Sequence, residues 1–191
     1  IQSLQSDAFP IMQFAFEVYD GEGNFKPDIQ ASDVKVIENG SEQALIKLEL
    51  SEPGLQSIFV INSSPELSAL AGTGTYFEKI KTGMLAWAQG RASNDLDDTS
   101  LIDNTGLKVI RTADIQQWEQ GVTEYSPDLL ASRQSLAALN MALDLALESN
   151  PRPHMKRSIL YISPPPLAEH GQALPNLADR AVRQGVVVNI W

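Results

Sequence analysis

Three short apolar runs constrain the fold of this chain most strongly. They are "SIFVIN" at residues 57–62, "RSILYIS" at 157–163 and "GVVVNIW" at 185–191. Their apolar residues follow one another without alternation, which is typical of strands covered on both faces, as in a parallel sheet. Helical patterns lie between the runs. Strands that alternate with helices predict an α/β, Rossmann-like layered fold with a mostly parallel central sheet flanked by helices.

Capping signals and apolar spacing predict three main helices. Thr75 and Glu78 form a capping box, and Gly90 ends the helix that they open. The run "SLAALNMALDLAL" at residues 135–147 predicts a second helix, and a third begins around Pro175 and stops at Gly185. The apolar residues predicted to face the core are Leu136, Leu139, Leu143 and Leu147 in the second helix, and Leu177, Ala181 and Val182 in the third.

Between the first and second of these helices, the sequence predicts a β hairpin and a short helix. The segments 99–104 and 107–112 are joined only by Thr105 and Gly106, so they must pair antiparallel. Asp114 and Gln117 then mark the start of a short helix that runs through Trp118.

Residues 11–50 carry a different period and predict an all-β appendage. Residues 11–19 alternate between apolar and polar, and residues 33–38 and 43–50 flank Asn39-Gly40, which is a strong signal for a two-residue hairpin. We therefore expect strands at 11–19, 33–38 and 43–50, outside the main sheet. The expected domains are an N-terminal β segment, 1–54, and an α/β domain, 55–191.

Composition excludes several classes of function. With 14 Lys and Arg against 24 Asp and Glu, the net charge is −10, which argues against binding to nucleic acid or an anionic membrane. The chain has no cysteine, so it has no disulfide and no thiolate metal site. No run of 18 apolar residues is present, so we expect no membrane insertion. Because the chain begins at Ile1, we expect it to be a piece of a longer protein.

The polar loop after the first apolar run is the candidate functional site. In open α/β sheets, ligands bind beyond the carboxyl ends of the strands, which indicates the loops after Ile61 and Ile162. The first loop carries Asn62, Ser64 and Glu66 at every second position. No matched acid, base and nucleophile accompany them, so an enzyme that uses this crevice is an alternative that the sequence does not favour.

Residues 57–191 resemble the von Willebrand factor type A domain. The resemblance rests on the order of elements: "SIFVINSSPEL", a helix, the hairpin "SLIDNTGLKVIRT", the segment "ADIQQW", the helix "LAALNMALDLALE", the strand "RSILYIS", a helix and "GVVVNIW". The first 52 residues, with "FEVYDGEGNFKPDIQASDVKVIENG", resemble more weakly the β segment that precedes this domain in many bacterial members. The resemblance implies a protein-interaction or adhesion module.

The family is known for a metal-ion-dependent adhesion site, and the resemblance implies that it is degenerate here. Its first Asp corresponds to Asn62, its first Ser to Ser64 and its second Ser to Glu66. The Asp after the fourth strand corresponds to Pro164, which has no side-chain ligand. The Thr position has no firm equivalent, and the nearest hydroxyls are Ser132 and Ser135. Because Mg²⁺ sites use one or two carboxylates, we expect no bound metal and no other cofactor.

We therefore expect a metal-free interaction or structural module of this class, located outside the cytoplasm or at a cell surface. Its protein partner is unknown. The candidate partner-binding residues are Asn62, Ser63, Ser64, Glu66, Ser132 and Ser163. An alternative is a metal-dependent adhesion domain that uses Glu66 and Ser64.

The last apolar run predicts an exposed sheet edge. The family usually has one more helix and one more strand after the strand that corresponds to 186–191, so the resemblance implies that the domain is truncated at its C-terminus. An edge strand with unpaired N–H and C=O groups is a template for association. We expect either the N-terminal β segment or a second copy of the chain to cover this edge, the second as a homodimer.

Overall fold

The computed structural model describes residues 3–5, 10–147, 155–165 and 170–191. The chain divides into two compact units, Ile1–Pro53 and Gly54–Trp191. Each unit is described here by itself.

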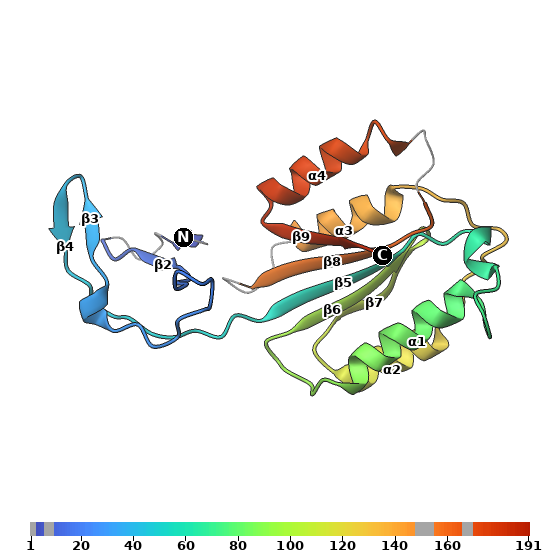
Figure 1. Ribbon diagram of the computed structural model, residues 1–191, viewed down its shortest axis with the longest axis horizontal. Coiled ribbons are helices and arrows are strands. Elements are labelled where there is room, and N and C mark those ends of the chain that lie inside the picture. Colours follow the sequence, from blue (N-terminus) through green and yellow to red (C-terminus); the bar gives the residue numbers. More distant parts are fainter. Residues whose placement is uncertain (1–2, 6–9, 148–154, 166–169) are drawn as a thin grey trace. The chain divides into compact units, whose positions relative to one another are not determined.

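The second unit is built on a five-stranded sheet in the order β7-β6-β5-β8-β9 (Figure 1). β5 pairs in parallel with β6 and β8, β8 pairs in parallel with β9, and only β6 and β7 are antiparallel. β5 is therefore central, and its residues are almost all buried. The strands are β5 (Leu55–Ile61), β6 (Asp98–Asp103), β7 (Gly106–Thr112), β8 (Lys156–Ile162) and β9 (Val186–Ile190).

Four helices cover the two faces of this sheet (Figure 1). One face packs with α3 and α4 around Ile58, Val60 and Ile159, and the other packs with α1 and α2 around Phe59, Ile61 and Trp118. A short 3-10 turn, η2, follows β5. These elements are η2 (Pro65–Ser68), α1 (Tyr76–Gln89), α2 (Ile115–Glu124), α3 (Ala137–Leu147) and α4 (Leu174–Arg183).

The predicted α/β architecture is confirmed. The three apolar runs form neighbouring parallel strands, and the hairpin lies on one side of them. The capping box also forms: Thr75 accepts a hydrogen bond from the Glu78 backbone N–H at 3.1 Å, and the Glu78 carboxylate accepts one from the Thr75 N–H at 2.7 Å. The α2 helix is longer than expected, because it continues six residues beyond Trp118 to Glu124.

Two of the predicted core positions are wrong. Val182 in α4 is 78% exposed, and Leu147 in α3 is 47% exposed. In α4 the buried positions are Leu177 and Ala181, which are four residues apart, and Val182 lies about 100° further around the helix. In α3 the small residues Ala138, Ala142 and Ala146 are buried together with leucines. The buried face of α3 is therefore rotated away from the face that the predicted leucines would define.

In its described residues, the first unit contains two small antiparallel pairs. They are β1 (Ser3–Gln5) with β2 (Gln13–Ala15), and β3 (Val36–Glu38) with β4 (Ser41–Gln43). Between them lies a 3-10 turn, η1 (Ala31–Asp33). Asn39 and Gly40 both have positive φ, of 50° and 80°, which confirms the predicted two-residue hairpin.

The strands predicted in this unit are too long. The prediction of a strand at 43–50 is wrong, because only Gln43 is in β4 and residues 44–50 form no ladder. The alternation of "ALIKLEL" resembles a half-buried strand, yet Ile46 and Leu50 are 75% and 66% exposed. The segments predicted at 11–19 and 33–38 likewise reduce to three-residue strands.

No helix among the described residues is long and apolar enough to span a membrane.

Candidate functional site

The side-chain amide of Asn62 joins three loops at the carboxyl edge of the sheet. Asn62 directly follows β5, and its N–H continues the ladder to the Ile162 carbonyl at 2.9 Å. Its Oδ1 accepts hydrogen bonds from the Ser135 backbone N–H at 3.0 Å and from Asn104 Nδ2 at 3.1 Å. Its Nδ2 donates to Ser163 Oγ at 2.9 Å. Because a backbone N–H is only a donor, the bond to Ser135 defines which way the amide points.

Asn104 extends this network from the β6–β7 turn. Besides Asn62, its Nδ2 contacts the carbonyl oxygens of Ser63 and Arg133, each at 2.8 Å. The amide is therefore shared among three oxygens, two from the loop after β5 and one from the segment before α3. We refer to Asn62, Asn104 and Ser163, with their bonded backbone groups, as the amide hub. Asn62, at the centre of the hub, is 1% exposed, whereas Asn104 and Ser163 are partly buried.

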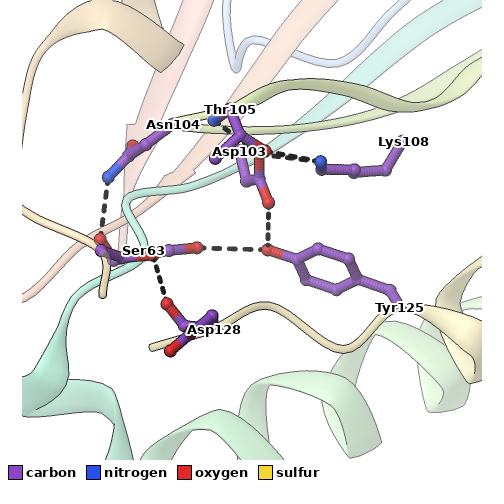
Figure 2. A network of polar contacts seen from close by, with 8 residues as sticks. Ser63, Asp103, Asn104, Thr105, Lys108, Tyr125 and Asp128 are labelled. Atoms are coloured by element: carbon purple, nitrogen blue, oxygen red, sulfur yellow. Dashed lines mark hydrogen bonds and ion pairs between the residues drawn. The ribbon is translucent and has the colours of Figure 1, made fainter. Parts of the chain in front are cut away.

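A second chain of hydrogen bonds runs from the loop after β5 to the end of β6 (Figure 2). Tyr125 Oη donates to Asp103 Oδ2 at 3.0 Å and lies 3.2 Å from Ser63 Oγ. Because the single phenolic proton is given to Asp103, Ser63 must donate to Tyr125. Burial, together with the neighbouring Asp103 carboxylate, raises the pKa of Tyr125 well above its usual value, so the phenol stays protonated.

The Asp103 carboxylate is buried and fully engaged. Its Oδ1 accepts hydrogen bonds from the backbone N–H and the hydroxyl of Thr105, both at 2.7 Å, and lies 3.4 Å from Lys108 Nζ. Lys108 also donates to Thr105 Oγ1 at 2.6 Å. Figure 2 shows the Asp128 side chain pointing toward Ser63 from the opposite side. Asp103 is thus a structural anion that holds the β6–β7 turn and the end of α2 together.

A cleft of about 700 Å³ opens beside these groups. The β6–β7 hairpin forms one wall, and the end of α2 with the segment that leads to α3 forms the other. The cleft meets the amide hub at Asn104 and Ser135, which belong to both. Its charged lining residues are Asp103, Lys108, Glu124, Asp128 and Arg133.

The architecture of the second unit is similar to that of several solved structures. No protein-family model and no curated protein matches the chain. Among solved structures, an aerotolerance-related membrane protein from Bacteroides fragilis matches with a TM-score of 0.57 at 19% identity, over 72% of this chain and 66% of that one. BatB from Bacteroides thetaiotaomicron, described as a conserved hypothetical protein, matches with 0.58 at 18%, over 72% and 65%. The VWA domain of SpRpn10 matches with 0.55 at 16%, over 73% and 74%.

The second unit has the fold of a von Willebrand factor type A domain. The chain spans just under two thirds of the length of the two Bacteroides structures. At these identities the likeness extends to the fold alone. In this fold the amide hub lies at the carboxyl ends of β5 and β8.

The VWA fold brings some of the candidate residues together. Asn62 and Ser163 are directly bonded, and Ser63 is joined to the same region through its carbonyl and Asn104. Ser64 is fully buried beside them, and Glu66 is exposed in η2. The ring of Pro164 is buried, and its carbonyl accepts a hydrogen bond from Ser163 Oγ at 2.8 Å.

Ser132 and Ser135 take different places. Ser135 is bonded to Asn62 through its backbone N–H, whereas the Ser132 hydroxyl donates to the Asp128 carbonyl at 2.6 Å. Both residues line the cleft. The hydroxyl of Ser132 thus stabilises its own loop.

Sequence reasoning missed Asp103, Asn104, Lys108 and Tyr125. A signal for the first two is present, because "LIDN" is a strand that ends in two polar residues at the same edge as Asn62. We interpreted this segment only as one arm of a hairpin. Tyr125 has no such signal, since its place beside Asp103 depends on how far α2 extends.

Proposed function

We propose that this chain is a protein-interaction module of the VWA class that binds its partner without a metal ion. The partner surface consists of the loops at the carboxyl edge of the sheet, with Asn62, Ser63, Ser64, Glu66, Ser132 and Ser163, together with the adjoining cleft. The observation that carries the proposal is the amide hub. It ties together, through neutral hydrogen bonds, the loops that a metal ion organises in the adhesion site of the family.

The residues at this edge fit a divalent ion poorly, which supports a metal-free site. Mg²⁺ is held by one or two carboxylates with waters, but Asn62 is a neutral amide whose Nδ2 faces Ser163 and whose Oδ1 already accepts two hydrogen bonds. Pro164 offers no side-chain ligand. Within the described part of the chain, no group of three or more His, Cys, Asp or Glu side chains is arranged to hold a metal.

Calorimetric titration with Mg²⁺, Mn²⁺ and Ca²⁺ tests this proposal. We expect no binding at micromolar concentrations of ion by the unmodified protein. The double variant Asn62→Asp/Pro164→Asp restores two carboxylates, and its affinity for Mg²⁺ should rise by at least about tenfold, equivalent to about 1.4 kcal/mol. Asn176→Asp, on an exposed position of α4, is the control for adding a charge.

Tight binding of any of these ions by the unmodified chain would contradict the proposal. It would support instead the alternative in which Ser64 and Glu66 hold a metal for adhesion. The proposed module is not an enzyme, and its place outside the cytoplasm is part of the same proposal.

We also propose that the chain forms a homodimer through β9, at the edge of the sheet. Among the described strands β9 pairs only with β8, and Val187, Ile190 and Trp191 are 61%, 73% and 60% exposed. β9 and the following Trp191 contain no charged side chain, although the chain carries a net charge of −10. Edge-to-edge pairing would satisfy its free N–H and C=O groups without bringing charged side chains of the two strands together.

Sedimentation equilibrium at micromolar concentration tests the dimer. The unmodified chain is expected to sediment as a dimer, and Val187→Lys should shift it to monomer, because a charge on an edge strand opposes pairing. Val182→Lys is the matched control, since Val182 is also an exposed valine, at 78%, but lies on α4. A monomeric unmodified chain would rule out this interface.

A further inference from the structure

The segment that follows the β3–β4 hairpin has the pattern of a strand but no strand beside it. Residues 44–50, "ALIKLEL", join no ladder among the described residues (Figure 1). Within the segment, Lys47 Nζ lies 2.5 Å from Glu49 Oε2, so these two side chains point to the same side of the chain. Side chains two residues apart share a side in an extended strand, and the contact is therefore the one that extended backbone gives.

The opposite side of the 44–50 segment is apolar and open. In the extended arrangement Ile46, Leu48 and Leu50 alternate with the two charged residues. Ile46 and Leu50 are 75% and 66% exposed, and Leu48 is partly buried. An extended segment with an apolar side and with backbone groups outside any described ladder is a template for pairing with another strand.

We propose that the 44–50 segments of two copies of the chain pair with each other as antiparallel strands, with Leu48 directly opposite its counterpart in the second copy. The inference rests on the homodimer proposed above, which brings the two copies together, and adds a second contact to it. The pairing would satisfy the backbone groups of the segment and cover its apolar side.

The contact through β9 is what makes the second contact stable. A two-stranded ribbon is only marginally stable by itself, whereas linking the two copies raises the effective concentration of one strand near the other. Residues 49–54 join Leu48 to β5 and can span about 20 Å when extended. That reach exceeds the distance of about 10 Å from β5 to β9, which lies two strands away, so both contacts can form in one dimer.

The two charges of the segment select the register. With Leu48 at the centre, Lys47 of each copy lies opposite Glu49 of the other, so both cross-strand pairs join opposite charges. A shift by two residues in either direction places lysine opposite lysine or glutamate opposite glutamate, and a parallel pairing in register does both. A shift by one residue sets each charge against an apolar side chain and separates the two apolar sides.

The apolar side is self-complementary in the same register. Leu48 meets its own counterpart, and Ile46 of each copy meets Leu50 of the other. These pairs cover the two most exposed side chains of the segment. Charge and apolar matching therefore agree on one partner strand, which is the same segment in a second copy of the chain.

Disulfide formation between introduced cysteines tests the register, because the chain has no cysteine of its own. Opposed residues in an antiparallel pair have Cα atoms about 4.5–5.5 Å apart, which a disulfide can span, so Leu48→Cys in the full chain should cross-link under mild oxidation. Leu45→Cys is the matched control, since Leu45 is also a partly buried leucine but would lie about 20 Å from its counterpart. Non-reducing electrophoresis should show cross-linking at least about tenfold faster for Leu48→Cys.

A charge swap tests what selects the register. In the Leu48→Cys background, Lys47→Glu should slow cross-linking by about fivefold, because it sets like charges opposite each other in both cross-strand pairs. The double variant Lys47→Glu/Glu49→Lys restores opposite charges and should recover the original rate. Lys26→Glu, at an exposed position of the same unit, is the control for the change in net charge and should leave the rate unchanged.

The outcomes separate this contact from the one through β9. Equal cross-linking of Leu48→Cys and Leu45→Cys in a chain that sediments as a dimer would overturn the strand pairing and leave the β9 contact standing. No recovery in the swapped variant would overturn the register. Adding Val187→Lys should abolish the cross-link, whereas a cross-link that persists there would support the strand pairing and reject the β9 contact. A monomeric unmodified chain would overturn both.

Discussion

Replacing Trp118 with alanine is expected to lower the free energy of unfolding of the VWA unit by about 3–5 kcal/mol. Trp118 is 0% exposed, and its ring centre lies 4.8 Å from that of Phe59 and 5.9 Å from that of Trp87. Its indole N–H has no hydrogen-bond partner in the described part of the chain, so packing alone accounts for the loss. Urea unfolding followed by far-UV circular dichroism measures the change.

Two further variants separate packing from general effects of tryptophan loss. Trp118→Phe should cost less than the alanine variant, because an aromatic ring still fills most of the space. Trp191→Ala, compared in the Val187→Lys background in which the edge is blocked, is the control at a 60% exposed position and should change the stability by less than about 1 kcal/mol. If Trp118→Ala and Trp191→Ala had equal effects, the proposed core around α1 and α2 would be wrong.

The second large effect is expected from Asn62→Leu, which keeps the size of the side chain and removes the amide hub. The stability should fall by about 2–4 kcal/mol, since each buried group left without its partner costs about 1–3 kcal/mol. The groups affected are the Ser135 N–H, the Asn104 amide and the Ser163 hydroxyl. The backbone N–H of Ser135 should exchange its hydrogen faster in the variant. Urea unfolding measures the total loss of stability.

Asn176→Leu, at an exposed site on α4, is the matched control for this substitution. An unchanged exchange rate at Ser135 in Asn62→Leu would mean that Asn62 does not organise the loop before α3. That result would also remove the main support for a hub that takes the place of a metal ion.

Much of the VWA fold could be predicted from sequence because its signals are local. The apolar runs, the capping box at Thr75 and the turn at Thr105-Gly106 each depend on neighbouring residues only. The weaker predictions depended on tertiary packing. Nothing in "ALIKLEL" itself says that no strand lies beside residues 44–50, and nothing near Val182 says which side of α4 meets the sheet.

The candidate site was predictable only in part, for the same reason. Asn62 and Ser163 end two apolar runs, and the rule for strand ends brings them together without a structure. The bond from Asn62 to Ser135 joins residues 73 apart, and Tyr125 meets Asp103 across 22 residues through a helix end that the sequence placed too early. These contacts depend on where loops turn, which single-sequence patterns do not determine.

The central position of β5 has a consequence for the order of folding. The β6–β7 hairpin is local and should form within about 1–10 μs. β5 must instead find β8 across about a hundred residues, and such distant pairing slows folding. The hub bonds of Asn62 span 42, 73 and 101 residues, and the last of them, to Ser163, closes only after β8 has joined β5. A chain still emerging from the ribosome would therefore carry its first three helices and its hairpin before the proposed partner surface is complete.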